Sequence, residues 1–286
     1  MQSISKDDVN RLSQNIVIPP RPELLNELHQ LAINKDANHQ DFVKLIAKDL
    51  GLSACVIKTA NSPAFLGRGQ VTNISHAISV LGQKNIRQIA TAFILRQSTQ
   101  SQATQSIVVA LEHFWEWSNR VAMISALVSQ HVGACNAEDM YCFGLFRDCG
   151  IPILLMRFPS YGRTLELAHQ ASDSQFLKIE EEFHQCHHAT IGYLVARAWL
   201  FPDEICEAIL QHHEEDFFVT ENPIAPSQTS CMVAIGRLAE HIEATLSHRP
   251  DPGWDGERGL AILKHLGLEL TEFEDLRDAI HSRFQD

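Results

Sequence analysis

Two groups of histidines have the residue type and the spacing that metal binding requires. His184 and His188 stand four residues apart, so one continuous helix would carry both on the same face. His212 or His213 of a following helix would then supply a further nitrogen, and glutamates precede His184 in the sequence. Such H-x-x-x-H spacing suits zinc. Helices also place polar residues four apart by chance, so histidines that are packed or hydrogen-bonded are the competing interpretation.

The seven cysteines do not form a metal or disulfide framework. They lie at positions 55, 135, 142, 149, 186, 206 and 231, with no C-x-x-C pair, and most fall within apolar helical stretches. An odd count at irregular spacing is typical of reduced thiols that are buried as small hydrophobic groups. The first residues have no apolar core of a signal peptide, and no run approaches the roughly 20 apolar residues that span a bilayer. We therefore expect a cytoplasmic protein.

Composition limits the classes of partner. The chain has 286 residues, of which 45% are hydrophobic and 20% charged, as in an ordinary globular protein with a sizeable core. Its net charge is −12 and its basic residues are scattered. Nucleic-acid binding depends on clustered lysine and arginine, so a protein or a small ligand is the expected partner, rather than nucleic acid or a membrane.

Hydrophobic periodicity predicts an all-α chain, because apolar residues recur at three- and four-residue spacing and no stretch alternates as a strand would. The predicted helices cover 6–14, 24–31, 42–50, 56–60, 74–81, 84–96, 107–132, 140–156, 161–171, 175–183, 189–200, 202–213, 229–247 and two further C-terminal segments, the last opened by Thr271.

Polar and helix-breaking residues divide these helices into lobes. Asn61, Ser62 and Pro63 end one helix, because proline lacks the amide of an interior turn and restricts its predecessor. Asn73 is the expected N-cap of the next helix and Gly82 its C-terminal stop. The polar segment 97–105 predicts a linker. We expect an N-terminal lobe at 1–100, a second helical lobe at 106–247 and a C-terminal extension at 248–286 that packs on the lobes.

An ordered array of motifs runs from Ile18 to Arg87. An I-P-P-x-P-x-L-L run is followed by D-x-x-L, A-N-S, an aromatic and glycine turn, T-x-I-x-x-A-I-x-x-L-G and an arginine. The residues that match are Ile18, Pro19, Pro20, Pro22, Leu24, Leu25, Asp49, Leu52, Ala60, Asn61, Ser62, Phe65, Gly67, Thr72, Ile74, Ala77, Ile78, Leu81, Gly82 and Arg87. This array resembles an HDOD domain, a relative of the HD phosphohydrolases found in bacterial signalling proteins. The resemblance covers roughly residues 15 to 245 and implies a multi-helical, two-lobed, HD-like fold.

The resemblance also implies where a catalytic metal would be held, and three of those four positions have changed. HD phosphohydrolases use a histidine on the first helix of the second lobe, a His-Asp pair on the next and a distant aspartate. Here the corresponding residues are Trp117, Arg147 with Asp148, and Gly236. Indole has no lone pair for a metal, arginine brings a permanent positive charge and glycine has no side chain. Because Asp148 alone persists, the resemblance implies a scaffold that has lost hydrolysis.

Histidines at outer positions of the family pattern persist. His188 matches the D-H-A-x-x-G segment, with His187 in place of the aspartate, and Trp199 and Pro202 match the W-x-L-P run that follows. His212 and His213 match the H-H motif. They are interpreted as packed residues inherited with the fold; the alternative is a divalent metal site of iron, manganese or zinc, formed by Asp148, His184, His188 and His213.

The same residues define a candidate pocket for an anion. Arg147 and Asp148, with His188, His212 and His213 from other helices, would bind a phosphate, nucleotide or carboxylate. Alternatively, Arg147 forms an internal ion pair that fills the former metal site.

These observations predict a non-catalytic signalling or regulatory module, with no catalytic residue and no cofactor. Its expected partner is a protein of a bacterial signalling pathway, with a small phosphorylated ligand as a further candidate. Two alternatives stay open. One is a metal-dependent phosphohydrolase whose remodelled ligands are Asp148, His188, His212 and His213; the other is a small-anion sensor centred on Arg147.

Overall fold

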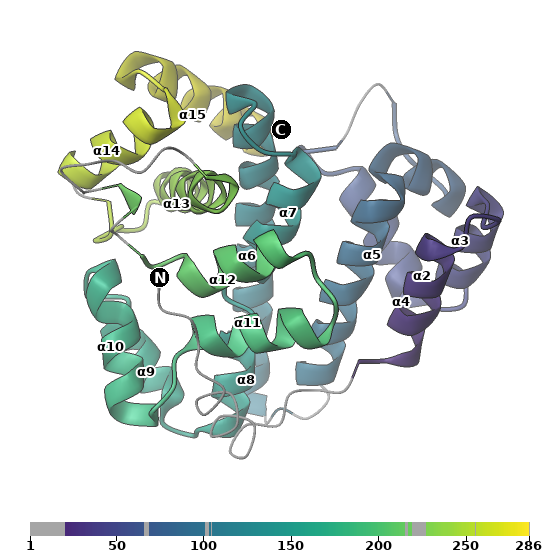
Figure 1. Ribbon diagram of the computed structural model, residues 1–286, viewed down its shortest axis with the longest axis horizontal. Coiled ribbons are helices and arrows are strands. Elements are labelled where there is room, and N and C mark those ends of the chain that lie inside the picture. Colours follow the sequence, from purple (N-terminus) through teal and green to yellow (C-terminus); the bar gives the residue numbers. More distant parts are fainter. Residues whose placement is uncertain are drawn as a thin grey trace.

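A computed structural model describes residues 21–65, 69–100, 103, 105–214, 217–218, 227–254 and 256–285. No strand occurs in these ranges, which confirms the all-α class (Figure 1). The predicted helix at 6–14 lies outside them. In chain order the helices are α2 (Glu23–Ile33), α3 (His39–Ile46), α4 (Leu50–Ala60), α5 (Ile74–Gln100), α6 (Gln105–Val132), α7 (Ala137–Phe146), α8 (Gly150–Arg157), α9 (Tyr161–Ala168), α10 (Asp173–His184), α11 (His188–Ala198), α12 (Asp203–Gln211), α13 (Gln228–Leu246), α14 (Gly256–Leu266) and α15 (Leu270–Gln285).

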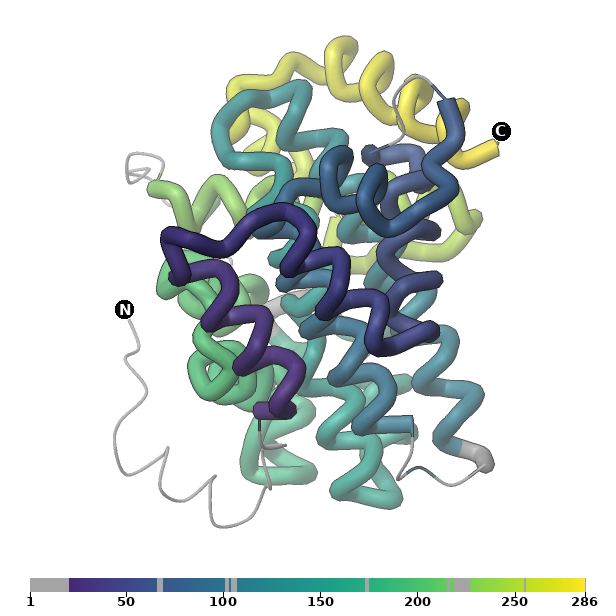
Figure 2. The backbone as a smooth tube through the Cα atoms, turned by 90° about the vertical axis from the view of Figure 1, so that its right-hand side faces the viewer, coloured from purple at the N-terminus to yellow at the C-terminus, as the bar shows by residue number. Residues whose placement is uncertain are grey.

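The first helices form a group of their own around α5. The helices α2, α3 and α4 all pack against α5, at the right of Figure 1. Each contributes the apolar stripe that its sequence predicted, and Leu28, Phe42 and Val56 are fully buried there. The tube view in Figure 2 shows the same helices, in purple and blue, side by side on one face of the molecule.

The turn after α4 is closed by the side chain of Asn61, as its sequence context predicted. Its amide nitrogen donates to the carbonyl oxygens of Ile57 at 3.0 Å and Val71 at 2.7 Å. Its amide oxygen accepts from the backbone nitrogen of Val71 at 2.8 Å. Asn73 then caps α5 by accepting from the amide of His76. Asn61 thus ties both sides of the turn together.

Helix α5 continues further than the sequence predicted. Gly82 has a left-handed φ of 77°, which confirms the expected break, but helical structure resumes at once and runs to Gln100. The first four residues of the predicted linker are therefore helical. Thr99 fits the helix because its hydroxyl donates to the carbonyl of Leu95 at 2.9 Å and lies buried. Only residues 101–104 separate α5 from α6, so the boundary between the proposed lobes is shorter than expected.

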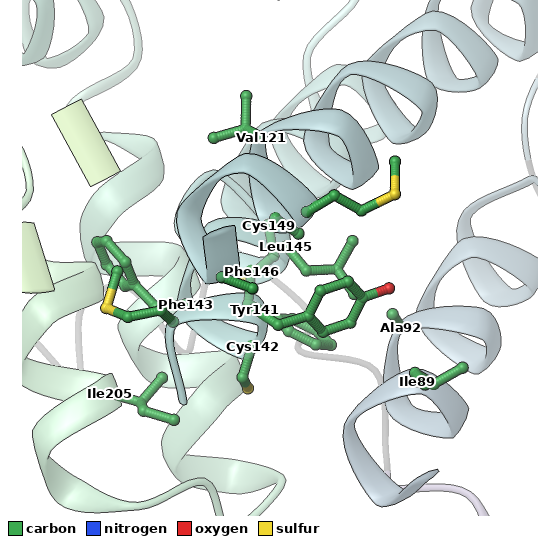
Figure 3. Packing of buried hydrophobic residues seen from close by; sticks show 14 of the residues in the cluster. Ile89, Ala92, Val121, Tyr141, Cys142, Phe143, Leu145, Phe146, Cys149 and Ile205 are labelled. Atoms are coloured by element: carbon green, nitrogen blue, oxygen red, sulfur yellow. The ribbon is translucent and has the colours of Figure 1, made fainter. Parts of the chain in front are cut away.

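The second helical group is built around the long helix α6. Helices α7 and α13 pack along α6, and α12 packs on α7 and α13. Tyr141, Phe143 and Phe146 of α7 are buried; Phe143 packs against Gly236 of α13, and Tyr141 points toward Ile89 and Ala92 of α5 (Figure 3). Gly144 permits the close contact of α6 and α7, since a Cβ there would lie 2.8 Å from the Cα of Ala122. This packing fixes the chain immediately before Arg147.

The predicted helix at 140–156 is two helices, which is a correction with consequences for the site. Helix α7 ends at Phe146, and α8 begins at Gly150 after a short turn. The guanidinium of Arg147 donates to the carbonyl of Gly144 at 2.9 Å in this turn. The turn directs Arg147 and Asp148 toward other helices instead of along a continuous helix face.

The C-terminal helices α14 and α15 cover one side of α13, as seen at the upper left of Figure 1. Ile262, Phe273 and Ile280 are buried in this contact. The last helix begins at Leu270, so Thr271 lies in its first turn and is not its cap. This packing agrees with the expected extension, and the division at 248 stays a proposal. None of the described helices is long and apolar enough to cross a bilayer.

Candidate metal centre

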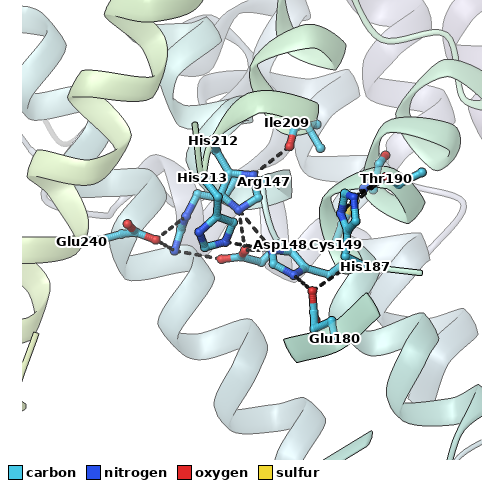
Figure 4. Close-up of polar contacts among 12 residues, drawn as sticks. Arg147, Asp148, Cys149, Glu180, His187, Thr190, Ile209, His212, His213 and Glu240 are labelled. Atoms are coloured by element: carbon cyan, nitrogen blue, oxygen red, sulfur yellow. Dashed lines mark hydrogen bonds and ion pairs between the residues drawn. The ribbon is translucent and has the colours of Figure 1, made fainter. Parts of the chain in front are cut away.

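Four side chains from three parts of the chain converge within the second helical group. Donor atoms of Asp148, His188, His212 and His213 all lie within 4.8 Å of one another. Figure 4 shows His212 and His213 beside Asp148. The Nε2 atom of His188 lies 3.1 Å from that of His212 and 3.2 Å from that of His213. The Oδ1 atom of Asp148 lies 3.1 Å from Nε2 of His212 and 3.2 Å from Nε2 of His188. We call these four residues the Asp–His cluster.

The local structure explains how these residues meet. Asp148 lies in the turn between α7 and α8, His188 is the first residue of α11, and the histidine pair directly follows α12. His187 caps α11 by accepting from the amide of Thr190 at 3.3 Å. Gly150 allows α8 to lie against the start of α11, because a Cβ there would be 2.1 Å from the carbonyl oxygen of His188. A larger residue would push His188 away from Asp148.

The orientation of His188 is set by a buried carboxylate. Its Nδ1 atom donates to Oε2 of Glu180 at 2.7 Å, and its backbone nitrogen donates to the same oxygen at 3.1 Å. The hydroxyl of Tyr161 donates to the other oxygen of Glu180. The carboxylate can only accept, so the His188 proton lies on Nδ1 and the lone pair of Nε2 faces the cluster when the ring is neutral. A carboxylate behind a histidine in this way is typical of metal ligands.

Glu180 was not expected in this role. The sequence suggested it as one of several acidic residues near His184, yet its side chain is fully buried beneath His188. One signal was present, since Glu180 follows the buried Phe176 by one helical turn and shares its face of α10. Its neighbour Glu181 is exposed, as a solvated helix face predicts.

His212 is oriented in the same manner by the backbone. Its Nδ1 atom donates to the carbonyl oxygen of Ile209 at 2.7 Å, which leaves Nε2 to face Asp148 and His188. The ring of His213 stacks on Phe176, with centroids 4.9 Å apart and 26° between the planes. The cluster therefore presents imidazole nitrogens toward one carboxylate oxygen in a buried space.

The electrostatics of the cluster favour a cation. Burial raises the pKa of the Asp148 carboxyl, but the Arg147 guanidinium and the neighbouring rings of His188 and His212 outweigh burial and hold that pKa well below its usual range. Burial lowers the pKa of His188, whereas Glu180 and Asp148 raise it to about 10. The two ionised carboxylates, Glu180 and Asp148, thus stabilise a positive charge at His188. A divalent ion fits the donor set, since imidazole nitrogens and a carboxylate oxygen suit zinc, iron or manganese.

Arg147 occupies the other side of Asp148. Its Nη2 atom lies 3.0 Å from Oδ2 of Asp148 and 2.7 Å from Oε1 of Glu240, and its Nε atom donates to Glu240 at 2.8 Å. Its guanidinium carbon lies 4.5 Å from the ring centroid of Trp117. The side chain is buried, with 1% of its surface exposed. Arg147 therefore forms the internal ion pair that was one of the two interpretations, with Asp148 and Glu240 as its partners.

The other changed positions of the HD pattern surround this arginine. The indole of Trp117 donates to Glu243 at 3.0 Å. Phe143 lies against Gly236, where a Cβ would be 2.6 Å from the ring. The aromatic ring thus occupies the space that the side chain of a metal ligand at position 236 would need. Glu240, one turn further along α13, reaches Arg147 instead. Sequence reasoning missed Glu240, although its spacing of four from Gly236 places both on one face.

His184 does not join the cluster, because it and His188 belong to two different helices. Helix α10 ends at His184, Gln185 has a left-handed φ of 56°, and α11 begins at His188. The Nε2 atom of His184 instead lies 2.9 Å from the hydroxyl of Thr164. The condition of one continuous helix is therefore not met, in line with the separate helices predicted at 175–183 and 189–200, and His212 joins the cluster while His184 does not. The five residues of the predicted anion pocket, Arg147, Asp148, His188, His212 and His213, do lie together.

Comparisons with known proteins agree with this fold. The HDOD domain family model matches residues 18–215. A curated uncharacterized protein of Treponema pallidum is 23% identical over 200 residues, or 68% of this chain, which spans only 37% of that protein's length.

Two solved structures extend the likeness over almost the whole chain. A Shewanella amazonensis protein named as a phosphohydrolase is 19% identical and has a TM-score of 0.68, with 96% of this chain and 93% of that one covered. A Marinobacter aquaeolei protein named for signal transduction is 21% identical with a TM-score of 0.61, with 100% of this chain and 62% of that one covered. At these identities the two structures show a shared fold.

Proposed function

Because this chain belongs to the HDOD family, we propose that it is a non-catalytic signalling module whose Asp–His cluster holds one divalent cation. A single observation carries the proposal: the two oxygens of Asp148 face different partners. Oδ1 points to the Nε2 atoms of His188 and His212, whereas Oδ2 lies 3.0 Å from the guanidinium of Arg147. A cation would therefore bind at Oδ1, among the imidazole nitrogens, because Oδ2 is already paired with Arg147.

The residues that would hold the ion are Asp148, His188, His212 and His213. A zinc, iron or manganese ion in an open site polarises a phosphoryl oxygen or lowers the pKa of bound water, but four protein ligands are the number of a closed, structural site. Here the ligands come from the α7–α8 turn, the start of α11 and the end of α12. In this role the cluster joins these three segments, and Glu180 and the Ile209 carbonyl keep the Nε2 lone pairs directed inward.

The position of Arg147 supports the proposal that the module is non-catalytic. A phosphohydrolase that uses two metals needs a second cation on the far side of the shared carboxylate. Arg147 supplies a positive charge there. Unlike a metal ion, however, a guanidinium does not coordinate a water molecule and lower its pKa to make it a nucleophile. It is held by Asp148 and Glu240 and packed on Trp117, so it is not free to leave for a substrate.

A metal-dependent phosphohydrolase with a remodelled site is the second candidate. The four-donor cluster favours it, as does the name of the Shewanella relative. A protein remains the proposed partner of the signalling module, in line with the name of the Marinobacter relative.

A phosphoesterase assay separates the two candidates. The full chain, loaded in turn with zinc, iron and manganese, is tested on p-nitrophenyl phosphate and bis(p-nitrophenyl) phosphate. We expect rates equal to those of the Asp148→Asn variant with every metal. Turnover that requires both Asp148 and a metal would instead establish the phosphohydrolase.

A further inference from the structure

A second polar site lies between the two helical groups, away from the Asp–His cluster. Helices α2 and α5 form one wall, and the loop between α11 and α12 forms the other. Figure 1 shows this loop facing α5. The pocket lies at the end of α11 opposite to His188, because Trp199 and Pro202 follow the last turn of that helix.

The charged groups of the described residues that line the pocket are all basic. Arg21, Lys84 and Arg87 contribute side chains, and among the described residues no carboxylate lines it. Lys84 is paired with Asp139 outside the pocket. Within the ranges that the structure describes, neither Arg21 nor Arg87 has an acidic partner. Two uncompensated guanidinium groups thus share one cavity in a chain whose net charge is −12.

Several polar atoms of this pocket are buried without a hydrogen-bond partner among the described residues. They are the Nε atoms of Arg21 and Arg87 and the side-chain oxygen of Gln88, whose side chain is almost fully buried. A buried polar atom without a partner is unfavourable, and more so when its group is charged. Three such atoms thus surround one cavity, and a bound ligand could supply their partners.

The pocket also has a positive potential. Burial lowers the pKa of Arg21, and the neighbouring Arg87 lowers it further. Burial likewise lowers the pKa of His29 on the same wall, with both arginines adding to the effect. These cations repel each other when the pocket holds no anion, so an anion would relieve that repulsion.

We infer that this pocket binds a small anion that carries a phosphate group. Guanidinium groups pair with phosphate through two parallel hydrogen bonds, and a phosphate dianion matches the charge of Arg21 and Arg87 together. A carboxylate would leave one of these charges unmatched. The apolar walls, with Leu28, Trp199 and Phe201, exclude water around the phosphate and strengthen the pairing. Such a ligand would join α2 and α5 to the α11–α12 loop.

Calorimetric titration of the full chain tests the inference. Inorganic phosphate and adenosine monophosphate are titrated at constant ionic strength into the wild type and into Arg87→Ala. We expect saturable binding at one site and an affinity at least tenfold weaker in Arg87→Ala. Arg96→Ala, on the same helix outside the pocket, is the matched control and should bind as the wild type does.

The variant is expected to fold, because it removes one of two repelling charges; its melting temperature without phosphate should equal or exceed that of the wild type. It also leaves the Asp–His cluster intact, so the result is independent of metal binding. Tenfold tighter binding of adenosine monophosphate than of phosphate would identify a phosphomonoester as the ligand, and equal affinities would identify the phosphate group alone. No saturable binding of either probe, or equal affinities of wild type and Arg87→Ala, would overturn the inference.

Discussion

The orientation and charge of the His188 side chain are set by Glu180, which lies on the side of the ring away from the cluster. Its ring is completely buried, and a neutral imidazole there would place its Nε2 lone pair against an ionised Asp148. Either a proton or a metal must therefore lie between Nε2 of His188 and Asp148. Glu180 stabilises the His188 ring in both states, because it accepts the Nδ1 proton in each case. The hydrogen bonds from His188 and Tyr161, with the charge of His188, lower the pKa of Glu180 although burial raises it.

Glu180→Gln should therefore weaken metal binding without disturbing the ligands themselves. The variant loses the negative charge that makes the His188 ring a better donor, and residues behind metal ligands commonly contribute about 10- to 100-fold in affinity. Chelator competition measures the dissociation constant. Glu181→Gln, at the exposed neighbouring position, is the control and should bind metal normally. Equal affinity in both variants would mean that Glu180 has no part in the site.

Glu243 is a second buried carboxylate, and it acts on stability. It accepts from the Trp117 indole at 3.0 Å and from Arg120 at 2.9 Å, and it is paired with Arg249. Burial raises its pKa, but the hydrogen bond from Ser247 and the two arginines lower the pKa below the usual value. Because the pKa is lower in the folded state, this group stabilises the protein above its unfolded pKa, and the gain is lost as the pH falls through the folded pKa.

Glu243→Gln is expected to lower the free energy of unfolding at pH 7 by about 2 kcal/mol, the size of a hydrogen bond to a charged group. The difference from the wild type should shrink as the pH falls below about 4.5, where the wild-type carboxylate also becomes protonated on unfolding. Urea unfolding between pH 3 and 7 measures this. Glu116→Gln, on the exposed side of α6, should match the wild type throughout. A difference that stays constant with pH would exclude the ionised carboxylate as its cause.

At the scale of elements, the break between α10 and α11 decides which histidines meet. Gln185 is exposed and adopts a left-handed conformation, which costs a residue with a Cβ roughly 1 kcal/mol. The break turns the chain so that His188 begins a new helix and faces the cluster, while His184 remains with Thr164. A glycine would adopt the same conformation without strain.

Gln185→Gly should raise the free energy of unfolding by about 0.5–1 kcal/mol, because the left-handed strain is removed and no packing is lost. Gln175→Gly, inside α10, should have the opposite sign and cost about 1 kcal/mol. Thermal and urea unfolding of both variants test the pair. Destabilisation by both would show that the left-handed turn is not strained.

The same scale shows what sequence reasoning could predict. Apolar spacing predicted nearly all the described helices, and Asn61, Asn73 and Gly82 were assigned correctly, because their roles depend on local backbone chemistry. The break at Arg147 was missed, since Leu145, Phe146, Ile151 and Leu154 are apolar and hide the interruption. The extension of α5 to Gln100 was missed because a polar segment was interpreted as a linker, although its residues are compatible with a helix.

At the scale of the whole molecule, the cluster depends on contacts between segments far apart in the sequence. Family resemblance indicated Asp148, His188, His212 and His213, but spacing alone suggested His184. Glu180 and Glu240 could not be assigned from the sequence, since a buried carboxylate and a solvated one look alike until their partners are placed. The same limit applies to the pocket at Arg21 and Arg87. Arg21 directly precedes α2 and Arg87 lies in α5, so the two meet only through the packing of α2 on α5.

The most direct test of the account is the metal content of the natively purified, untagged and dialysed protein, measured by elemental analysis beside His212→Ala and His184→Ala. We expect about one equivalent of zinc, iron or manganese in the wild type and in His184→Ala, and less than a tenth of that in His212→Ala, because His212 contributes a ligand and His184 does not. A metal-free wild type that also takes up no metal on reconstitution, or equal metal in all three proteins, would contradict the assignment of the Asp–His cluster as a metal centre.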